Sequence, residues 1–360
     1  MLSLTWQGAL AWRLRRHLLD PVGSTSAAEV VDALGAVAAQ LDPAAAELGI
    51  RLRRQASLPG DVQRAVGDGW LIRTFAFRGA VHLMTPDQAT PHLALGAASR
   101  MWERPSWQSH YRLPASDWPD LRSVVREALA DGPLTRRQLA AAVGADPRFE
   151  HLASAFTDPS ATFLKPFAWQ GDLSLGSSSG ELTLQALDSS PRWTGLPDLD
   201  AAGRRAIKLY LRAYGPASED NLHYWLSEGL GVRRALVGHW ISRLGDRLTT
   251  VEVEGEPRMV LADDLQELVG TPPTSAVRLL PKYDQWVLGP GTADAHVVPP
   301  SLRPEVSRGA NLIVSAGVVA GTWSMRGADV VLTWWAGAQE PLRADLDAEI
   351  ERLGALSSAR

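Results

Sequence analysis

Residues 30–54 read VVDALGAVAAQLDPAAAELGIRLRR. The segment opens as an apolar helix, breaks at Pro43 and resumes as an Ala-rich amphipathic helix. The break places Gln40 and Asp42 between two helices, and the second helix ends in a basic cluster, Arg51, Arg53 and Arg54. A polar pair beside a basic cluster is suited to presenting a reactive group to an anion. The pattern therefore predicts a functional site near residue 40.

Helix signals continue on both sides of this segment. Residues 5–19 place Leu and Trp side chains on one face, and residues 27–39 follow a Ser/Thr segment that offers an N-cap. Residues 61–66 predict another short helix. Residues 70–84, WLIRTFAFRGAVHLM, are instead β-rich on both sides of Arg78–Gly79, which indicates a hairpin. Short helices followed by a hairpin are typical of a winged helix, a helix-turn-helix with a β wing.

The same layout recurs twice. A predicted helix at 118–129 precedes GPLTRRQL at 132–139, and a predicted helix at 199–214 precedes GPASEDNL at 215–222. Gly-Pro ends one helix, Ser or Thr caps the next, and Leu turns inward. Each copy also has a candidate wing: residues 167–187, turning at GSSSG 176–180, and residues 248–261, turning at EGEP 254–257. The pattern indicates an internal repeat.

The last part of the chain is different in character. A Pro/Thr linker at 270–275 precedes four β-rich segments and a final helix, at 276–288, 310–317, 318–325, 330–335 and 342–353. The sequence therefore predicts an α+β fold of tandem winged-helix repeats plus a β-rich C-terminal domain. The expected domains are residues 1–115, 116–195, 196–270 and 271–360.

Composition narrows the class of protein. The chain has 360 residues and a formal net charge of −4, which argues against a uniformly basic surface but leaves room for a local patch. There is no cysteine, so disulfides, thiolate catalysis and Cys-based zinc sites are excluded. No apolar run approaches the ~20 residues of a membrane span, and the first 19 residues place their charges after the apolar run, unlike a signal peptide. We expect a cytoplasmic protein with no membrane contact.

General catalytic motifs are missing. The sequence has no phosphate-binding Gly loop, no HExxH and no nucleophile elbow, and its eight histidines are scattered. We therefore expect no metal and no other cofactor. Winged helices meet DNA through arginine and polar side chains. The candidate DNA contacts are Arg51, Arg53, Arg54, Arg78, His82, Arg136 and Arg137, and further basic groups occur at 13–16, 204–212 and 233–234. The alternative for any one cluster is a solvated helix face.

Six segments, taken in order, resemble the winged-helix DNA glycosylases of the AlkZ/YcaQ-like group. They are LAWRLRRHLL at 10–19, VVDALGAVAAQ at 30–40, LIRTFAFRGAVHLM at 71–84, LYLRAYGPASEDNLHYW at 209–225, VRLLPKYDQWVLG at 277–289 and GTWS at 321–324. The resemblance implies three tandem winged helices and a β-rich C-terminal part around a concave face that binds double-stranded DNA. It also implies hydrolytic removal of bulky alkylated bases, in DNA repair or self-resistance.

The family's catalytic signature, Gln-x-Gln or Gln-x-Asp, directly follows the second helix. Aligned on the preceding Val-Val and Leu, it falls on Ala38-Ala39-Gln40, where the first glutamine is missing. Shifted by two residues, Gln40-Leu41-Asp42 is a complete Gln-x-Asp. A carboxylate can accept the proton of the attacking water and stabilise an oxocarbenium cation, whereas glutamine can only orient the water. This chemistry favours Gln40 and Asp42 as the catalytic pair, although Asp before Pro is also an ordinary N-cap.

Other readings stay open. Arg78 and His82 occupy the family's Arg-Gly-Thr-x-His segment, with Ala80 in place of threonine. Both side chains are candidates to approach the DNA backbone. The alternative for His82 is a buried, hydrogen-bonded position on the strand. The same fold also suits a non-catalytic winged-helix DNA-binding protein, a regulator or lesion sensor with a degenerate signature. A third reading is a small-molecule or protein partner on the concave face. We expect a monomer.

Overall fold

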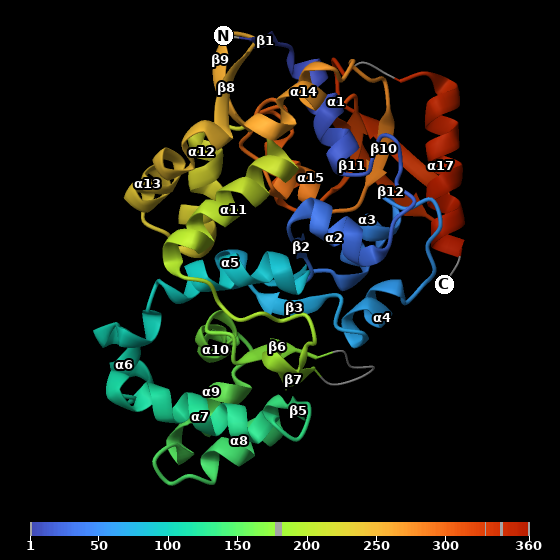
Figure 1. Cartoon of the computed structure of the whole chain (residues 1–360). Coiled ribbons are helices and arrows are strands. Elements are labelled where there is room, and N and C mark those ends of the chain that lie inside the picture. Colours follow the sequence, from blue (N-terminus) through green and yellow to red (C-terminus); the bar gives the residue numbers. More distant parts are fainter. Residues whose placement is uncertain (1, 177–181, 328, 339–340, 359–360) are drawn as a thin grey trace.

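The computed structural model describes residues 2–176, 182–327, 329–338 and 341–358. Helices and sheets are mixed along the chain, which agrees with the α+β class at this level (Figure 1). One end of the molecule holds α6 to α9, the middle holds α5 and β3, and the other end holds the C-terminal sheet with α17 along its side. Among the described residues, no helix is both long and apolar enough to cross a bilayer.

The first segment forms four helices: α1 (Trp6–Arg16), α2 (Ala27–Leu34), α3 (Pro43–Arg51) and α4 (Asp61–Gly67). Ser26 and Glu29 form a capping box at the start of α2. The helix predicted over 27–39 ends earlier, because Gly35 has a φ of 75° and residues 37–38 form strand β2. The candidate site thus lies on a strand and the loop after it.

The predicted hairpin is confirmed. Strands β3 (Ile72–Phe75) and β4 (Val81–Met84) pair antiparallel, and Gly79 between them has a φ of 65°, which glycine adopts without strain. β2 (Val37–Ala38) adds to the far side of β4. Two helices that the sequence pattern did not indicate follow: α5 (Pro86–Ala97) and α6 (Pro105–Tyr111).

The first copy of the predicted repeat begins with α7 (Trp118–Leu129), whose bounds agree with the prediction. The remaining elements are β5 (Leu134–Thr135), α8 (Arg136–Gly144), α9 (Ala153–Thr157), α10 (Lys165–Trp169), β6 (Leu173–Leu175) and β7 (Thr183–Ala186). β6 and β7 pair antiparallel, and residues 177–181 of the predicted GSSSG turn lie outside the described residues. Thr135 caps α8 in a capping box with Gln138.

The second copy begins with α11 (Leu199–Tyr214), also as predicted. Ser218 and Asn221 form a capping box at α12 (Glu219–Leu222), so both copies start their second helix in the same way. A π-helical turn, His223–Glu228, and α13 (Arg234–Leu244) follow. The segment predicted to be a wing contains the antiparallel pair β8 (Leu248–Val253) and β9 (Glu256–Leu261), and β1 (Ser3–Leu4) joins β8 in parallel.

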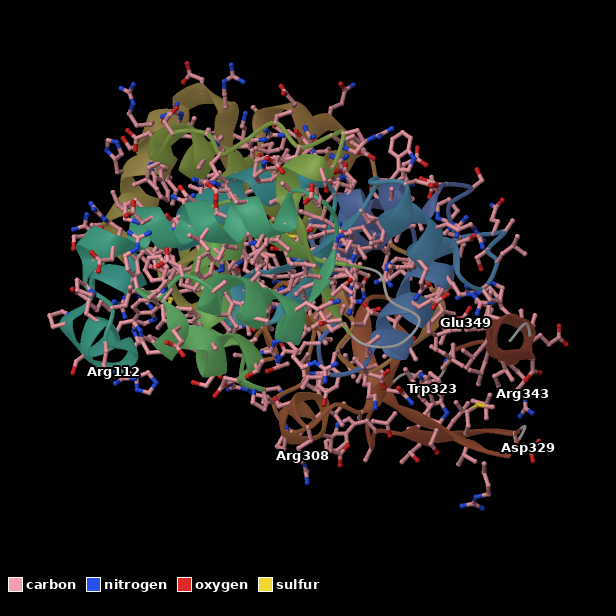
Figure 2. The ribbon with its side chains drawn as sticks, turned by 90° about the horizontal axis from the view of Figure 1, so that it is seen from below. Arg112, Arg308, Trp323, Asp329, Arg343 and Glu349 are labelled. Atoms are coloured by element: carbon pink, nitrogen blue, oxygen red, sulfur yellow. The ribbon has the colours of Figure 1, made fainter. Side chains whose placement is uncertain are left out.

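The C-terminal sheet has the order β10-β11-β12-β13, all antiparallel. Its strands are β10 (Val277–Leu280), β11 (Asn311–Ser315), β12 (Val318–Arg326) and β13 (Asp329–Trp334). The helices of this part are α14 (Leu265–Val269), α15 (Gln285–Leu288), α16 (Arg303–Ser307) and α17 (Arg343–Ser358). Seen from below, β12 and β13, which carry Trp323 and Asp329, lie beside α17 at one edge of the molecule (Figure 2).

The prediction of an extended segment through residue 288 is wrong at its end. The Asp284 side chain accepts a hydrogen bond from the backbone N–H of Trp286 at 2.8 Å and caps α15. The strand stops at Leu280, and the loop over 281–284 turns toward the N-terminal part of the chain.

The first two predicted units share one sheet. β3 and β6 meet at Arg73 and Leu175, giving the order β2-β4-β3-β6-β7-β5. One buried cluster also combines residues from Ala36 to Leu261, with Tyr210, Tyr214 and Trp225 at its centre. These contacts fix β2 and the hairpin relative to α11 and to the turn that follows α12.

Candidate active site

A pocket of about 240 Å³ lies where the β3–β4 hairpin meets the C-terminal part of the chain. Its lining comes from five separate segments: Ala38, Gln40, Leu41 and Asp42; Phe77, Arg78, Ala80 and His82; Trp225; Tyr283, Gln285 and Leu288; and Ser307. The structure therefore brings together four of the residues that the sequence singled out: Gln40, Asp42, Arg78 and His82.

Gln40 is held at the rim by the hairpin. The backbone N–H of Ala39 donates to the carbonyl of Val81 at 2.9 Å, and the N–H of Val81 donates to the Gln40 side-chain oxygen Oε1, also at 2.9 Å. The side chain thus continues the ladder of β2 and β4. Within the described residues its amide nitrogen has no hydrogen-bond partner, so it is available to a ligand or a water.

Strand alternation decides which residues face the pocket. Ala38 and Gln40 both line it, whereas Ala39 points to the other side and is buried among apolar side chains. Asp42, two residues farther on, lines the pocket again. Both possible positions of the signature, 38/40 and 40/42, therefore lie at the same pocket.

Asp42 has two partners. It is the N-cap of α3, with Oδ1 accepting the N–H of Ala45 at 2.9 Å, and Oδ2 lies 2.9 Å from Nζ of Lys282. The hydrogen bond from Lys282, with the one from Ala45, lowers the pKa of the Asp42 carboxyl, and the carboxylate in turn raises the pKa of Lys282. At neutral pH the pocket therefore contains a fixed negative charge.

Aromatic rings form another part of the pocket lining. The rings of Phe77 and Trp225 lie 3.8 Å apart between centroids, and the guanidinium of Arg78 lies over Tyr224 at 4.4 Å. Arg78 is exposed and has a φ of 54°. A non-glycine residue in this left-handed region costs about 1–3 kcal/mol, and such strain clusters at functional sites. The hairpin thus holds a cation at the pocket rim.

His82 is buried beside this cation. It is only 5% exposed, and Nδ1 donates to the carbonyl of Ala80 at 2.9 Å, which leaves the lone pair on Nε2. Burial, together with the charge of Arg78, lowers the pKa of His82 to about 4. The side chain is therefore neutral at physiological pH, and its burial matches the structural role weighed for it from sequence.

Three buried histidines make stability depend on pH: His82, His92 and His17, whose pKa burial lowers well below its usual value. Burial lowers the pKa of both His82 and His92 to about 4, below the ~6.5 of an unfolded histidine. The unfolded chain then binds more protons between these values, so stability is complete above pH ~6.5 and is lost as pH falls toward 4. We expect the free energy of unfolding, measured in urea, to fall by up to ~1.4 kcal/mol per pH unit for each histidine.

His82→Asn should remove the contribution of one histidine to this slope and leave the contributions of His92 and His17. A free energy of unfolding that stays constant between pH 6.5 and 4.5 would contradict the assignment of all three groups.

The structure places the basic cluster at the end of α3 largely inside the protein. Arg53 is fully buried and forms two hydrogen bonds to the Asp284 carboxylate, at 2.7 and 2.8 Å, so it does not reach DNA. Arg54 bonds to the Thr25 carbonyl and to Asp61, and Arg51 is largely buried near Ser57. Intramolecular partners therefore occupy Arg53 and Arg54, whereas Arg51 makes, among the described residues, only the contact from Nε to Ser57.

Arg136 and Arg137 lie away from the pocket. Arg136 donates to the carbonyls of Phe156, at 2.9 Å, and Asp158, whereas Arg137 is exposed. Their helix, α8, lies near the lower end of the molecule, whereas α15 lies in its upper half (Figure 1). In the described part of the chain, no cluster of three or more His, Asp or Glu side chains is arranged to hold a metal ion.

Comparison with known proteins gives the family. The model of the family described as DNA glycosylase AlkZ-like matches residues 31–356. The chain belongs to this family. An interstrand DNA cross-link repair glycosylase of Streptomyces sahachiroi is 36% identical over 339 residues, covering 92% of this chain and 91% of the relative. The solved structure of Streptomyces sahachiroi DNA glycosylase AlkZ matches with a TM-score of 0.91 and 33% identity, covering 98% of both chains. The resemblance inferred from sequence is confirmed.

In this AlkZ-like glycosylase, sequence reasoning missed part of the pocket. Tyr283 and Gln285 line it from the segment that also carries Lys282, the partner of Asp42, and Trp225 comes from the turn after α12. The signal was present, because these residues belong to VRLLPKYDQWVLG and LHYW, two segments that carried the resemblance. The buried ion pair between Asp284 and Arg53 fixes this loop, so Arg53 holds the loop in place without lining the pocket itself.

Proposed function

We propose that this AlkZ-like protein hydrolyses the N-glycosidic bond of bulky alkylated bases in double-stranded DNA, using Gln40 and Asp42. The observation that supports the proposal is the convergence of an amide, a carboxylate, a neutral imidazole and an exposed arginine around one pocket of about 240 Å³. The family provides the reaction class, and the pocket provides groups suited to it.

The chemistry follows from charge and hydrogen bonding. Loss of the base leaves positive charge on the sugar, which the Asp42 carboxylate stabilises because it is negative at neutral pH. The free amide nitrogen of Gln40 donates to the attacking water, and Asp42 accepts the proton that this water loses. Arg78, exposed at the rim, suits a DNA phosphate.

A non-catalytic DNA-binding protein is the second candidate. Two observations favour it: Ala38 occupies the strand position beside Gln40 that faces the pocket, and both Asp42 oxygens already have partners. The contact with Lys282 lowers the pKa of Asp42 and makes it a weaker base. A protein of this kind would bind damaged DNA without releasing a base.

Release of free base distinguishes the two functions. We expect the protein to release alkylated purine from duplex DNA carrying N7- or N3-alkylated purines. Because the Streptomyces relative is described as a cross-link repair glycosylase, DNA with an interstrand cross-link through alkylated purines is the second substrate. Tight binding without any free base, on both substrates, would support the non-catalytic protein.

The Ala38→Gln variant tests which position of the signature operates. If Gln40 and Asp42 form the catalytic pair, they already orient the attacking water, so an added glutamine should change the rate of base release by less than about threefold. An increase of roughly tenfold or more would assign the reaction to residues 38 and 40. Folding, monitored by circular dichroism, is the control, because Ala38 is half-buried and faces the pocket.

The finer architecture is also a proposal. We propose that residues 1–115, 116–195 and 196–270 are three winged helices and that residues 271–360 form the C-terminal domain. The matching capping boxes at Thr135 and Ser218 and the hairpins at β3–β4, β6–β7 and β8–β9 support it. We further propose that the protein acts as a monomer in the cytoplasm, and light scattering of the purified chain measures the first point.

A further inference from the structure

The face of α11 that points away from the pocket carries a stripe of positive charge. Arg204, Lys208 and Arg212 are four residues apart, so their side chains share one side of the helix over about 12 Å. The opposite side holds Tyr210 and Tyr214, whose hydroxyls donate to the carbonyls of Gly289 and Leu34. The helix therefore lies between the stripe and the residues next to the pocket.

Neighbouring residues extend the stripe. The charged groups that act most strongly on Lys208 are all arginines: Arg247, Arg205, Arg212 and Arg204. Burial, followed by these arginines, lowers the pKa of Lys208. Arg247 comes from the 3-10 turn before β8, so two separate elements deliver charge to the same place.

These cations lack counter-ions. Arg205 pairs with Asp87, but within the described ranges no carboxylate lies within 4.0 Å of the charged groups of Arg204, Lys208, Arg212 or Arg247. Some exposed arginines elsewhere are neutralised by acidic neighbours: Arg100 by Glu103, Arg148 by Asp120 and Asp146, and Arg343 by Asp347. Others in the described part of the chain, such as Arg233 and Arg308, also lack an ion pair but do not form a stripe on one helix face. Like charges on one helix face repel and weaken the helix. An unneutralised stripe in a chain with a net charge of −4 thus indicates an anionic partner.

We propose that the α11 stripe, formed by Arg204, Lys208, Arg212 and Arg247, binds the phosphate backbone of DNA as a second contact outside the pocket. A duplex carries about one negative charge per 1.7 Å of its axis, so the ~12 Å stripe spans about seven phosphates. The proposal rests on DNA binding by this protein but not on the identity of its catalytic residues. It predicts that DNA beyond the lesion contributes to affinity.

The test compares duplex lengths in the triple variant Arg204→Gln, Lys208→Gln, Arg212→Gln. On a duplex of about 30 base pairs, the slope of log affinity against log salt should decrease by roughly 2–3, because each lost phosphate contact contributes about 0.9. Affinity for this duplex should fall at least about tenfold. On a duplex of one helical turn, ~10 base pairs, affinity and base release should stay within about twofold of wild type.

A matched control has Arg100→Gln, Arg148→Gln and Arg343→Gln, which remove the same formal charge from arginines that already have counter-ions. The control should keep the wild-type slope. An unchanged slope in the stripe variant, or an equal decrease in the control, would overturn the proposal. Competition by polyglutamate as effective as that by DNA would also overturn it, in favour of an acidic protein partner. If wild type releases no base but the salt slope of the stripe variant decreases as expected, the result supports DNA binding by the stripe and contradicts the catalytic proposal.

Discussion

Asp42→Asn is expected to slow release of an alkylated base by roughly 10²–10⁴-fold, the usual effect of losing a general base. The variant keeps the shape of the side chain but removes the charge that faces the developing cation. DNA affinity should not fall, because the carboxylate contributes no attraction to phosphate. Single-turnover base release and duplex binding, measured on the same preparation, separate the two effects.

Folding should survive this change. Asn caps helices about as well as Asp, so the hydrogen bond from the N–H of Ala45 is retained. Asp146→Asn is a matched control, since Asp146 also pairs with a basic side chain but lies on the surface by Arg148. The control should leave base release unchanged. An Asp42→Asn protein that is as active as wild type would exclude Asp42 as the base and direct attention to Ala38, Gln40 and His82.

Gln40→Ala should have a smaller effect on the same assay. Orienting a water contributes less than deprotonating it, and the lost contact to the Val81 N–H is at the rim of the hairpin. The order of the two effects is itself informative, because a glutamine-based signature would make Gln40 the more important residue.

Local signals predicted much of the fold. The helices at 118–129 and 199–214 have the predicted bounds, because capping residues and turns at their ends are encoded within a few positions. The hairpins at 70–84 and 248–261 followed from their β-rich residues and turn residues. Residues 285–288 were misread, because four residues carry too little periodicity to distinguish a helical turn from a strand.

At the candidate site, the sequence could not predict contacts between residues that are far apart in the chain. Gln40 and Asp42 could be found from a local motif, but the partner of Asp42 is Lys282, which belongs to another part of the chain. The partner of Arg53 is 231 residues away in the sequence. A helix ending in arginines has the same local pattern whether its side chains meet solvent, phosphate or a buried carboxylate. Only tertiary structure distinguishes Arg53, which is buried, from Arg78, which is exposed.

Arg53→Met is expected to lower the free energy of unfolding by about 3–5 kcal/mol, the range seen when one partner of a buried ion pair is removed. Both guanidinium ends are engaged: Nη1 donates to the Gly49 carbonyl at 2.7 Å and to Asp284 Oδ2 at 2.8 Å, and Nη2 donates to Asp284 Oδ1 at 2.7 Å. The variant leaves the Asp284 carboxylate buried without its cation. Urea unfolding at neutral pH measures the loss.

Two further variants test whether the lost stability comes from the unpaired charge of Asp284. Arg64→Met removes an exposed arginine that pairs with Asp61, and it should cost less than about 1 kcal/mol. The double variant Arg53→Met, Asp284→Leu removes both charges and should regain much of the stability lost in Arg53→Met. Because Asp284 also caps α15 and holds the loop with Lys282, the double variant should still release base poorly. A loss below about 1 kcal/mol in Arg53→Met would show that this pair does not fix the loop.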